Sequence, residues 1–494
     1  MPLPDSIVGY TQADRVRVRL VLEDRFLLLD HAPGYSDQTS AGCLSSISCV
    51  SAPSTHALRQ NSIVYFNILW AELLPSTLQN QLSVLTIDYC KVKNDKKATL
   101  DRVSFLIDAQ NERTCEDWID NLLSKAYRNA VRNKRLLVLI NPFGGQGTAM
   151  TRYMRDSAPM LAAARCRVYE IETKYKGHAS EIVENMEGLE QKYDAIVCCS
   201  GDGIPHEVFN GLCKRTNVAA AFKVPVCQLP CGSGNALCHN LVGSNDLPFA
   251  TLSVIKGIPI SVDLCSLTQD NKRYITFLSQ ALGMIADCDL GTENMRWMGE
   301  SRFTVGLIMR VLSGAKYPCR VSVRISHESR TQVRQAYQEH KNKDEHMSTS
   351  EQSDQLPELK YGTVHDPVPE DWKSIDSSSL AVFYVGKMPW MSSDALFFPA
   401  ALPRDGYLDM VLIDSSVPKK EIFSILLGVA EGKHFDSKYL HYYKVDAYRI
   451  EPKAQSGYIS IDGESFNFTP FQVELHPGLG TLLSRTGEFQ APGI

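Results

Sequence analysis

Four glycine-rich or acidic turns are the parts of this sequence that could carry out chemistry. The first is the run 141–147 (Asn-Pro-Phe-Gly-Gly-Gln-Gly), which follows an apolar stretch and precedes a helical one. Glycines in such a turn let backbone N–H groups approach phosphate oxygens, beside the positive end of a helix dipole. The run lacks the Gly-Lys-Ser/Thr of P-loop nucleoside triphosphatases, and alone it is equally typical of an ordinary strand-to-helix turn.

The other three turns add a carboxylate, a hydroxyl and further backbone donors. The run 200–203 (Ser-Gly-Asp-Gly) places one carboxylate between two glycines directly after the apolar run 195–199. A carboxylate on such a turn can accept a hydroxyl proton or position a metal ion, and phosphoryl transfer needs both. The run 230–236 (Pro-Cys-Gly-Ser-Gly-Asn-Ala) again joins a strand to a helix. The fourth turn, 462–464 (Asp-Gly-Glu), is of a kind that is usually only a hairpin.

The elements around the glycine turns alternate between strands and helices. Apolar or β-branched runs at 136–140, 167–172, 194–199 and 224–229 each lead toward a helical stretch, which is the βαβ pattern of a parallel sheet. Ligands of such sheets bind outside the carboxyl ends of the strands, where the glycine turns lie here. The sequence therefore predicts an α/β domain with a parallel sheet over 131–265 and a phosphate-binding site at its glycine turns.

Two further regions flank this domain. Strand-like runs dominate beyond residue 265 and predict a second, mainly antiparallel β domain over 266–494. Within it, 327–379 is rich in Ser, Glu, Gln, Lys and Asp, which predicts a flexible insertion. The segment 1–130 contains short β-prone runs followed by a helical period from Cys115, so it predicts a small β-rich module. That order resembles a pleckstrin-homology domain and equally fits a generic β module.

The composition of the chain indicates which class of protein it belongs to and in which cellular compartment it is expected. The chain has 494 residues and a formal net charge of -5, so it has no overall attraction to nucleic acid. Its 14 cysteines form no framework, which favours a reducing compartment. No apolar run approaches the ~18 residues of a membrane span, and the N-terminus has neither a signal-peptide pattern nor a glycine for myristoylation. We expect a cytoplasmic protein that meets membranes only peripherally.

In this order and spacing, the four turns resemble the diacylglycerol-kinase type of catalytic domain, and within that superfamily the chain is similar to sphingosine kinases. The most specific stretch is 285–290 (Ile-Ala-Asp-Cys-Asp-Leu), continued by matching residues at 293–306. Runs typical of the carboxyl end of these kinases follow at 431–434, 451–453 and 476–477. The resemblance covers about 135–480 apart from the insertion, and it implies a β-sandwich-like lipid-binding domain over 266–494 with ATP in the cleft beside the α/β domain.

The resemblance also implies a reaction and a set of site residues. ATP with Mg²⁺ would give its γ-phosphate to the primary hydroxyl of sphingosine, dihydrosphingosine or phytosphingosine, with Asp202 as the general base. The residues implied to contact ATP or its metal are Asn141, Pro142, Phe143, Thr173, Lys174, Tyr175, Lys176, Gly177, Glu207, Gly232, Ser233, Gly234, Arg296, Arg302, Asp462, Gly463 and Glu464. Those implied to face the lipid head group are Ser200, Gly201, Asp202, Gly203 and Asp289.

One departure and three alternatives remain at this stage. Gln146 stands where the family often has a lysine inside the glycine turn, so the phosphates would lose a positive charge there and rely on backbone donors. The alternatives are a diacylglycerol or ceramide kinase of the same fold, a soluble NAD kinase, and a non-catalytic lipid-binding protein on this scaffold. The stretch 285–306 argues against an NAD kinase, and the retention of Asp202, Arg296, Arg302 and Glu464 argues against a non-catalytic protein.

Overall fold

The computed structural model describes residues 3–13, 15–31, 62–75, 82–145, 147–291, 301–342 and 354–494, without the side chains at 301–304 and 376–379. These residues divide into two compact units. The first contains Met1–Asn133 with Pro159–Cys166, and the second contains Lys134–Ala158 with Arg167–Ile494. Among the described residues the cysteines are free thiols, and no helix is both long and apolar enough to cross a membrane.

The first unit is built on a seven-stranded antiparallel sheet in the order β4-β3-β2-β1-β7-β6-β5. Its strands are β1 Ser6–Thr11, β2 Arg17–Leu22, β3 Phe26–His31, β4 Ser62–Val64, β5 Ile68–Leu74, β6 Leu82–Lys93 and β7 Lys97–Asp108. Helix α2 (Glu112–Tyr127) buries Trp118 and Leu122 on one face, as apolar residues at helical spacing require. The hydroxyl of Tyr127 donates to the carbonyl of Leu69 on β5. The predicted β-rich character is confirmed, and the pleckstrin-homology assignment stays a prediction.

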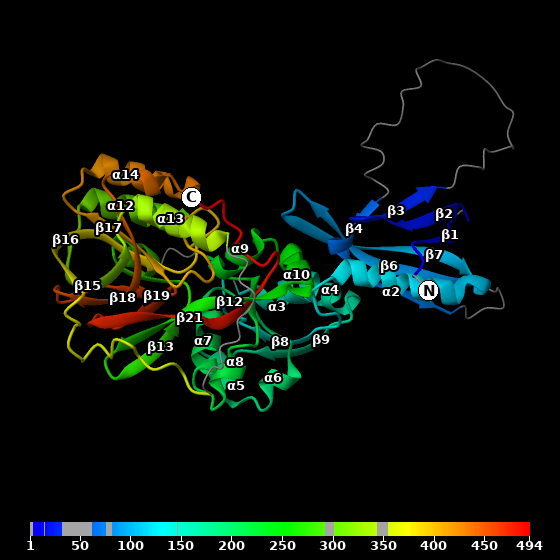
Figure 1. Ribbon diagram of the computed structural model, residues 1–494, viewed down its shortest axis with the longest axis horizontal. Coiled ribbons are helices and arrows are strands. Elements are labelled where there is room, and N and C mark those ends of the chain that lie inside the picture. Colours follow the sequence, from blue (N-terminus) through cyan, green and yellow to red (C-terminus); the bar gives the residue numbers. More distant parts are fainter. Residues whose placement is uncertain are drawn as a thin grey trace, which may run out of the picture. The chain divides into compact units, whose positions relative to one another are not determined.

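The second unit begins with four parallel strands in the order β11-β10-β8-β9. They are β8 Arg135–Ile140, β9 Arg167–Glu172, β10 Ala195–Ser200 and β11 Val226–Pro230. Strands β10 and β11 are buried throughout because helices cover both faces of the sheet, with α9 and α10 on one side and α5 and α6 on the other (Figure 1). The helices of this region are α3 Ala149–Arg152, α5 His178–Asn185, α6 Leu189–Lys192, α7 Gly203–Leu212, α8 Val218–Ala221, α9 Ala236–Val242 and α10 Leu247–Lys256, with a π-helical turn at Tyr153–Ser157. Helix α4 Ala158–Ala163, apart from its first residue, belongs to the first unit. The predicted parallel α/β fold is confirmed.

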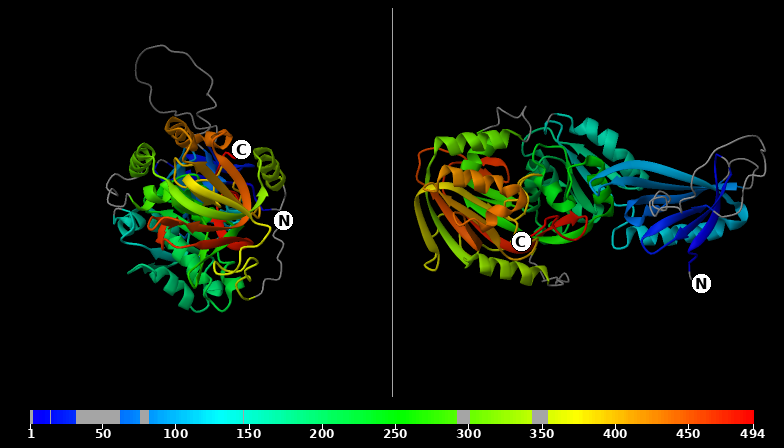
Figure 2. Two further views of the ribbon diagram at one scale, coloured as in Figure 1. Left: turned by 90° about the vertical axis from the view of Figure 1, so that its left-hand side faces the viewer. Right: turned by 90° about the horizontal axis from the view of Figure 1, so that it is seen from above.

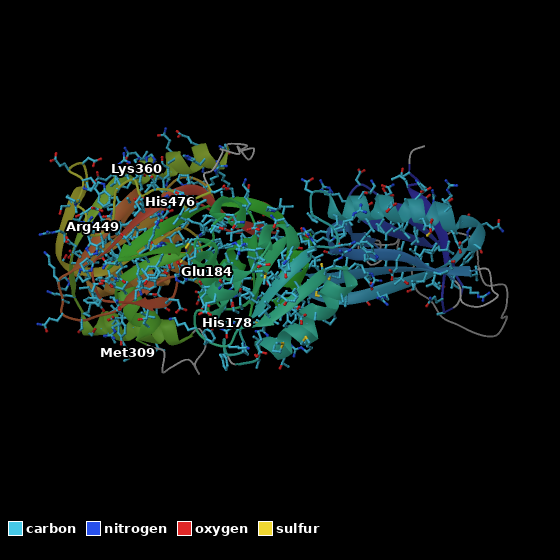
Figure 3. The ribbon with its side chains drawn as sticks, turned by 90° about the horizontal axis from the view of Figure 1, so that it is seen from below. His178, Glu184, Met309, Lys360, Arg449 and His476 are labelled. Atoms are coloured by element: carbon cyan, nitrogen blue, oxygen red, sulfur yellow. The ribbon has the colours of Figure 1, made fainter. Side chains whose placement is uncertain are left out.

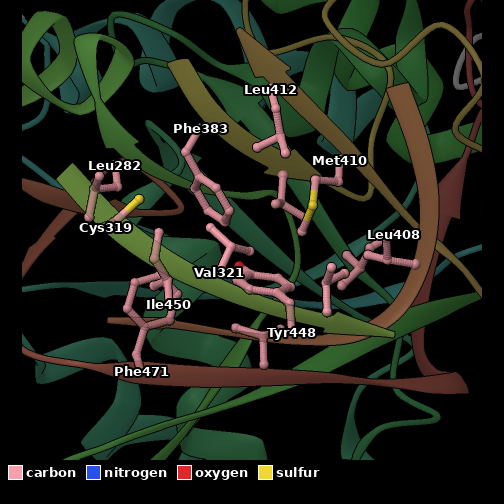
Figure 4. Close-up of a cluster of buried hydrophobic side chains, with 14 of the residues drawn as sticks. Leu282, Cys319, Val321, Phe383, Leu408, Met410, Leu412, Tyr448, Ile450 and Phe471 are labelled. Carbon is pink, nitrogen blue, oxygen red and sulfur yellow. The ribbon is translucent and has the colours of Figure 1, made fainter. Parts of the chain in front are cut away.

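The remaining strands are antiparallel and continue the same sheet. They are β12 Ile258–Gln269, β13 Lys272–Thr276, β14 Ser279–Gly283, β15 Tyr317–His327, β16 Lys373–Gly386, β17 Leu408–Asp414, β18 His441–Pro452, β19 Ile459–Ile461, β20 Glu464–Phe466 and β21 Phe471–Ser484. Strand β21 joins the two regions, because it pairs in parallel with β11 and antiparallel with β12. The inward-facing side chains form a buried core around Phe383, Tyr448 and Phe471 (Figure 4). This confirms the predicted β-sandwich-like region.

Four helices pack on this antiparallel region: α11 Met284–Leu290, α12 Ser301–Ser313, α13 Arg330–Lys341 and α14 Lys419–Leu427. In Figure 2 the orange α14 lies between the two yellow-green helices α12 and α13. Helices α12 and α14 contact each other, and α11 packs on α12 and β14. The stretch 284–290, which carries the most family-specific residues, is therefore held between a strand and a helix.

The prediction of one flexible insertion over 327–379 is wrong for much of its length. Helix α13 lies inside it and begins with a capping box, in which Ser329 and Gln332 each satisfy the other's backbone N–H. The helix buries Val333 and Tyr337. The last part of the predicted insertion, from Lys373 onward, belongs to β16. Residues 343–353 lie outside the described part of the chain.

The segment 354–372 of this insertion is also held in place, by polar contacts. The carboxylate of Glu474 on β21 accepts the N–H groups of Lys360 and Tyr361 at 3.0 and 3.1 Å. Arg449 on β18 donates to the carbonyls of Thr363 and Asp366 at 2.9 and 2.8 Å, and Figure 3 shows Lys360 and Arg449 on the same side of this region. A segment poor in aliphatic residues is ordered here because buried polar side chains bind its backbone.

A buried network of five charged side chains ties β12, β16, β17 and β18 together. The ammonium of Lys387 lies 2.9 Å from Asp263 and 2.5 Å from Asp405, and that of Lys444 lies 2.6 Å from Asp405 and 2.8 Å from Asp409. All five side chains are at most 2% exposed. Although burial opposes ionisation, the two ammonium groups lower the pKa of Asp405 to about 2. The network thus contains two ammonium groups and three carboxylates, and burial raises the pKa of Asp409, a rise that Lys444 opposes and the charge of Asp405 increases.

Candidate active site

A cavity of about 1270 Å³ in the second unit is lined by residues of all four predicted turns. Three of these turns follow β8, β10 and β11, so they meet at the carboxyl ends of neighbouring parallel strands, where ligands of such sheets bind. The fourth, 462–464, connects β19 to β20. Apolar side chains line another part of the wall and come from the antiparallel region: Leu278, Ala281, Ile285, Leu307, Ile308, Phe397, Phe423, Leu426, Leu427 and Val429. Polar and apolar surfaces thus share one cavity.

The three glycine turns lie backbone against backbone. A Cβ added to Gly232 would lie 2.2 Å from the Cα of Gly201, much closer than two carbon atoms can approach without a bond. Gly145 has a φ of +60°, and a Cβ there would lie 2.6 Å from the carbonyl oxygen of Cys231. Only glycine allows this approach. The close packing brings the donors of three turns to one wall of the cavity.

Asp202, the predicted general base, is fixed at the start of α9. Its carboxylate oxygens accept the N–H groups of Ala236 and Leu237, each at 3.0 Å, and the amide of Gln228 at 3.4 Å. Burial raises the pKa of Asp202, the hydrogen bonds from Leu237 and Ala236 oppose that rise, and the negative charge of Asp462 adds to it. A carboxylate with a raised pKa is a stronger base. The geometry therefore holds a basic carboxylate at the cavity wall.

Glu464 lies directly over the Asp202 turn. A Cβ added to Gly203 would come within 2.6 Å of a carboxylate oxygen of Glu464, so the glycine makes room for this acid. The other oxygen of Glu464 lies 2.6 Å from the ammonium of Lys176, which belongs to the loop between β9 and α5. Because the Lys176 side chain is 75% exposed, this ion pair contributes little to stability. Its effect is to bring two predicted nucleotide contacts together.

The carboxylate of Asp462 forms hydrogen bonds with other residues of the protein. Its carboxylate accepts the hydroxyl of Thr276 at 2.6 Å and the N–H groups of 277–279 at 2.9–3.2 Å, and it lies 2.8 Å from Nδ1 of His206. The side chain is fully buried. These contacts fix the hairpin that carries Glu464. Direct binding of ATP or metal by the Asp462 carboxylate stays a prediction, to which the contacts add nothing.

Glu207 also positions a loop. Its two carboxylate oxygens accept the N–H groups of Gly177 and Ala179 at 2.7 and 3.0 Å. They thereby satisfy free donors at the start of α5 and hold the end of the loop 173–177 against α7. Glu207 also lines the cavity, so contact with a nucleotide remains compatible with this arrangement.

Asp289 reaches the cavity, whereas Asp287 on the same helix does not. Asp289 accepts a hydrogen bond from the hydroxyl of Ser460 on β19. Asp287 is buried, accepts the hydroxyl of Tyr317 at 2.5 Å and lies 3.3 Å from Nε of Arg310. Of the two acids in the motif, Asp289 alone is placed to meet a ligand of the cavity.

Most, but not all, of the predicted site residues line the cavity. Those that do are Asn141, Phe143, Thr173, Tyr175, Lys176, Gly201, Asp202, Gly203, Glu207, Gly232, Ser233, Gly234, Asp289, Asp462, Gly463 and Glu464. Pro142, Lys174, Gly177 and Ser200 do not, and Ser200 is fully buried with its hydroxyl donating to the carbonyl of Gly201. Arg296 and Gln146 lie outside the described residues, and Arg302 lies in α12 without a described side chain.

Sequence reasoning missed two features of the wall. One is Arg152 at the end of α3, whose only signal was a basic residue soon after the first glycine turn. The other is the apolar lining from α12 and α14, exemplified by Leu307 and Phe423. Helical spacing of apolar residues in these two stretches could have indicated an apolar face, but not that this face borders the cavity.

The carboxylates of the wall suit a magnesium ion held together with phosphate. Mg²⁺ in such sites takes one or two carboxylates plus phosphate oxygens and water. Glu464 lies beside the Asp202 turn on the cavity wall, so it is the acid that would hold the ion, while Asp202 stays available as the base. Within the described part of the chain, no three His, Cys, Asp or Glu side chains gather into an all-protein metal cage.

Comparison with protein-family models divides the chain in the same way. The diacylglycerol kinase catalytic domain matches residues 135–267, and the YegS C-terminal NAD kinase beta sandwich-like domain matches 368–484. A domain of unknown function matches 11–128. A putative diacylglycerol kinase from Bacillus anthracis has a similar structure, with a TM-score of 0.50, 18% identity, and coverage of 72% of this chain and 98% of that one. At this identity the likeness concerns the fold alone.

Curated relatives are similar over most of the chain. Sphingoid long chain base kinase 5 of Saccharomyces cerevisiae is 36% identical over 451 residues, which cover 78% of this chain and 65% of the relative. This match therefore spans slightly less than two thirds of the yeast protein. Sphingoid long chain base kinase 4 of Schizosaccharomyces pombe is 34% identical, with coverage of 90% and 94%. Sphingosine kinase 1 of Homo sapiens is 30% identical, with coverage of 71% and 91%.

Proposed function

The chain belongs to the family of sphingoid long-chain base kinases, and we propose that it transfers the γ-phosphate of ATP to the primary hydroxyl of a sphingoid base. The observation that carries this proposal is the shared cavity. Glycine turns suited to phosphate, the carboxylate of Asp202, the second carboxylate of Asp289 and an apolar wall all border it. A sphingoid base offers a hydroxyl, an amine and a hydrocarbon chain, and each has a counterpart there.

In the proposed reaction Asp202 accepts the proton of the primary hydroxyl. The hydroxyl oxygen forms the new bond to the γ-phosphorus, and the bond to the β–γ bridging oxygen breaks as ADP leaves. Backbone N–H groups of the glycine turns face the phosphates. Mg²⁺, when bound with the nucleotide, neutralises charge on the phosphate oxygens. Arg296 and Arg302 stay predicted contacts of the transferred phosphate on the family resemblance alone.

Asp289 supports sphingoid bases over other lipids of the same superfamily. A sphingoid base carries a protonated amine beside the reacting hydroxyl, whereas diacylglycerol and ceramide carry none. A carboxylate that meets this amine in a partly desolvated pocket would distinguish the two classes electrostatically. Ser460 holds the Asp289 carboxylate at the wall, so the acid is positioned before a substrate arrives.

Asp289→Ala should lower kcat/KM for the sphingoid base about 10- to 100-fold, because a charge-assisted contact contributes roughly 1.5–3 kcal/mol. The Kd for an ATP analogue should barely change. Asp287→Asn is the matched control, since that acid sits on the same helix and faces Tyr317. If the Asp289 variant phosphorylates the sphingoid base as fast as the wild type, or if it loses as much affinity for ATP as for the lipid, another group must bind the amine.

The experiment that tests the function itself is a phosphorylation assay of the purified full chain with ATP and Mg²⁺ on a lipid panel. Sphingosine, dihydrosphingosine and phytosphingosine should be phosphorylated, while diacylglycerol and ceramide should give less than about a tenth of that rate, as loss of one charged contact requires. Equal or faster turnover of diacylglycerol would reassign the chain to another lipid kinase of this fold. Lipid binding without ATP turnover would make it a non-catalytic scaffold.

We further propose that the protein is cytoplasmic and meets its substrate at a membrane surface. Four apolar side chains on α12 and α14 are 42–79% exposed: Ile308, Met309, Leu312 and Leu427. Ile308 and Leu427 also line the cavity, and Figure 3 shows Met309 at the outer edge of its helix. Exposed apolar groups beside a cavity suited to lipid support contact with a bilayer. Sedimentation with lipid vesicles, compared between the wild type and Met309→Glu, tests this.

A further inference from the structure

The first glycine turn contains no basic side chain. The run 141–147 has Gln146 and no lysine or arginine, although a polyphosphate brings several negative charges to this wall. Among the described side chains of the cavity wall, the basic ones are Lys176 and Arg152. Lys176 already pairs with Glu464. Arg152 is therefore the described cation of the wall that forms no ion pair there.

Arg152 is built into the element that follows the turn. It is the last residue of α3 (Ala149–Arg152), a helical turn that begins directly after the glycines. Side chains of a helix lean toward its N-terminus, so the guanidinium of Arg152 leans back toward the glycine turn. It shares the wall with Gly144, Gly145 and Cys231. Its charge also acts on Cys231, whose pKa is lowered first by the Cys199 thiol and further by Arg152.

The side chain of Arg152 is half-buried and forms no ion pair with another described residue, although its charge, after that of Arg155, helps to lower the pKa of Asp156. Arg155, on the same stretch, forms an ion pair with Asp156 at 2.7 Å and is 69% exposed. Because Asp156 is already bound by Arg155, it compensates the half-buried guanidinium of Arg152 only in part, and a further anion would stabilise that guanidinium. The fixed planar fork of a guanidinium suits two phosphate oxygens at once. The position and chemistry of Arg152 therefore suit an anion of this kind.

We propose that Arg152 binds phosphate oxygens of the nucleotide and supplies, from one helical turn downstream, the positive charge that the glycine turn lacks at position 146. This rests on the proposed use of ATP and names a further nucleotide-binding residue. Arg152 lies on the helix that follows the glycine turn. The backbone that would donate N–H groups to the phosphates therefore also positions the guanidinium beside them. ATP affinity in this chain should then depend on a residue outside the glycine motif.

Binding of a non-hydrolysable ATP analogue with Mg²⁺ to the full chain, measured by calorimetry without lipid, tests this directly. Arg152→Ala should raise the Kd about 10- to 100-fold, as loss of a charged hydrogen-bonding group requires. Arg152→Lys should retain part of the affinity, because a point charge remains without the fork. Arg155→Ala, the matched control, should stay within about twofold, since an exposed pair contributes little. The KM for ATP should rise with the Kd, while kcat at saturating ATP stays within about threefold of wild type.

A second variant tests whether a positive charge placed elsewhere on the cavity wall can replace that of Arg152. Thr148 lines the cavity at the N-cap of α3, and Thr148→Lys in the Arg152→Ala background should recover part of the lost affinity. Equal Kd values for Arg152→Ala and Arg155→Ala, with the wild type binding normally, would overturn the assignment of Arg152 and leave the proposed function intact. Failure of the wild type to bind the analogue would overturn both. A fall in melting temperature without ligand that accounts for the weaker binding would make Arg152 structural.

Discussion

Replacing Asp202 with asparagine should lower kcat for sphingoid-base phosphorylation by about 10²- to 10⁴-fold, the range that a positioned general base contributes. The amide keeps the size of the carboxylate but cannot accept the proton. Because burial raises the pKa of Asp202, the wild-type rate should fall with acid above the usual range of an aspartate, as the base becomes protonated. The residual activity of the variant should lack this acid limb.

The control for this variant follows from the contacts of Asp202. Its two oxygens accept the N–H groups of Ala236 and Leu237, and an asparagine must turn its NH₂ toward one of these donors. We therefore expect a modest loss of thermal stability and nearly unchanged binding of an ATP analogue. Turnover within a few-fold of wild type would contradict the assignment of Asp202 as the base, whatever the stability.

Lys387→Met should lower the free energy of unfolding by about 3–5 kcal/mol, because removing one member of a buried charge network leaves its partners uncompensated. The carboxylates of Asp263 and Asp405, at most 2% exposed, would both lose the ammonium that lies within 2.9 Å. Lys444 would remain next to Asp405 but does not contact Asp263 among the described ion pairs. The shift in the denaturant midpoint, multiplied by the slope of the transition, measures the effect.

The matched control is Lys373→Met. Lys373 pairs with Glu328, and both side chains are more than half exposed, so the loss should stay below about 1 kcal/mol. Equal midpoints for the two variants would show that the buried network adds nothing to stability. If Lys387→Met does not accumulate as folded protein, Tyr442→Phe offers a milder change, because it removes only a hydroxyl, which donates to Asp409 at 2.7 Å and accepts the N–H of Ala400 at 3.4 Å. We expect that variant to lose about 1–2 kcal/mol.

The strands and turns of the site could be predicted because each depends on residues that are near one another in sequence. An apolar run closed by glycines identifies β10 and its turn, and the same holds for β8 and β11. The fate of Asp462 could not be predicted in this way. Its carboxylate accepts hydrogen bonds from Thr276 and from the backbone of 277–279, which lie almost 200 positions earlier in the chain. A sequence motif identifies the acidic residue, but it does not show which hydrogen-bond donors bind to its carboxylate oxygens.

For the segment 354–372 the sequence predicted too little structure. Its composition predicted flexibility because few of its residues can be buried. The buried groups belong instead to the sheet beneath it, where Glu474 and Arg449 bind its backbone. Order of this kind depends on side chains that lie 83 to 114 residues away in the sequence, so the sequence of the segment by itself could not have indicated it. Arg152 escaped notice for a related reason, since only the structure shows that its helix starts at the cavity wall.

The contact between Gly201 and Gly232 limits how the gene for this protein can vary. Most tight contacts allow compensation, because a larger residue on one side can be matched by a smaller one on the other. Here both partners already have no side chain, and a Cβ on Gly232 would lie 2.2 Å from its neighbour. A missense change at Gly232 therefore has no second-site suppressor at Gly201. In a collection of naturally occurring alleles, the Gly232 codon should tolerate only synonymous change, whereas an exposed position such as Met309 should drift freely among apolar residues.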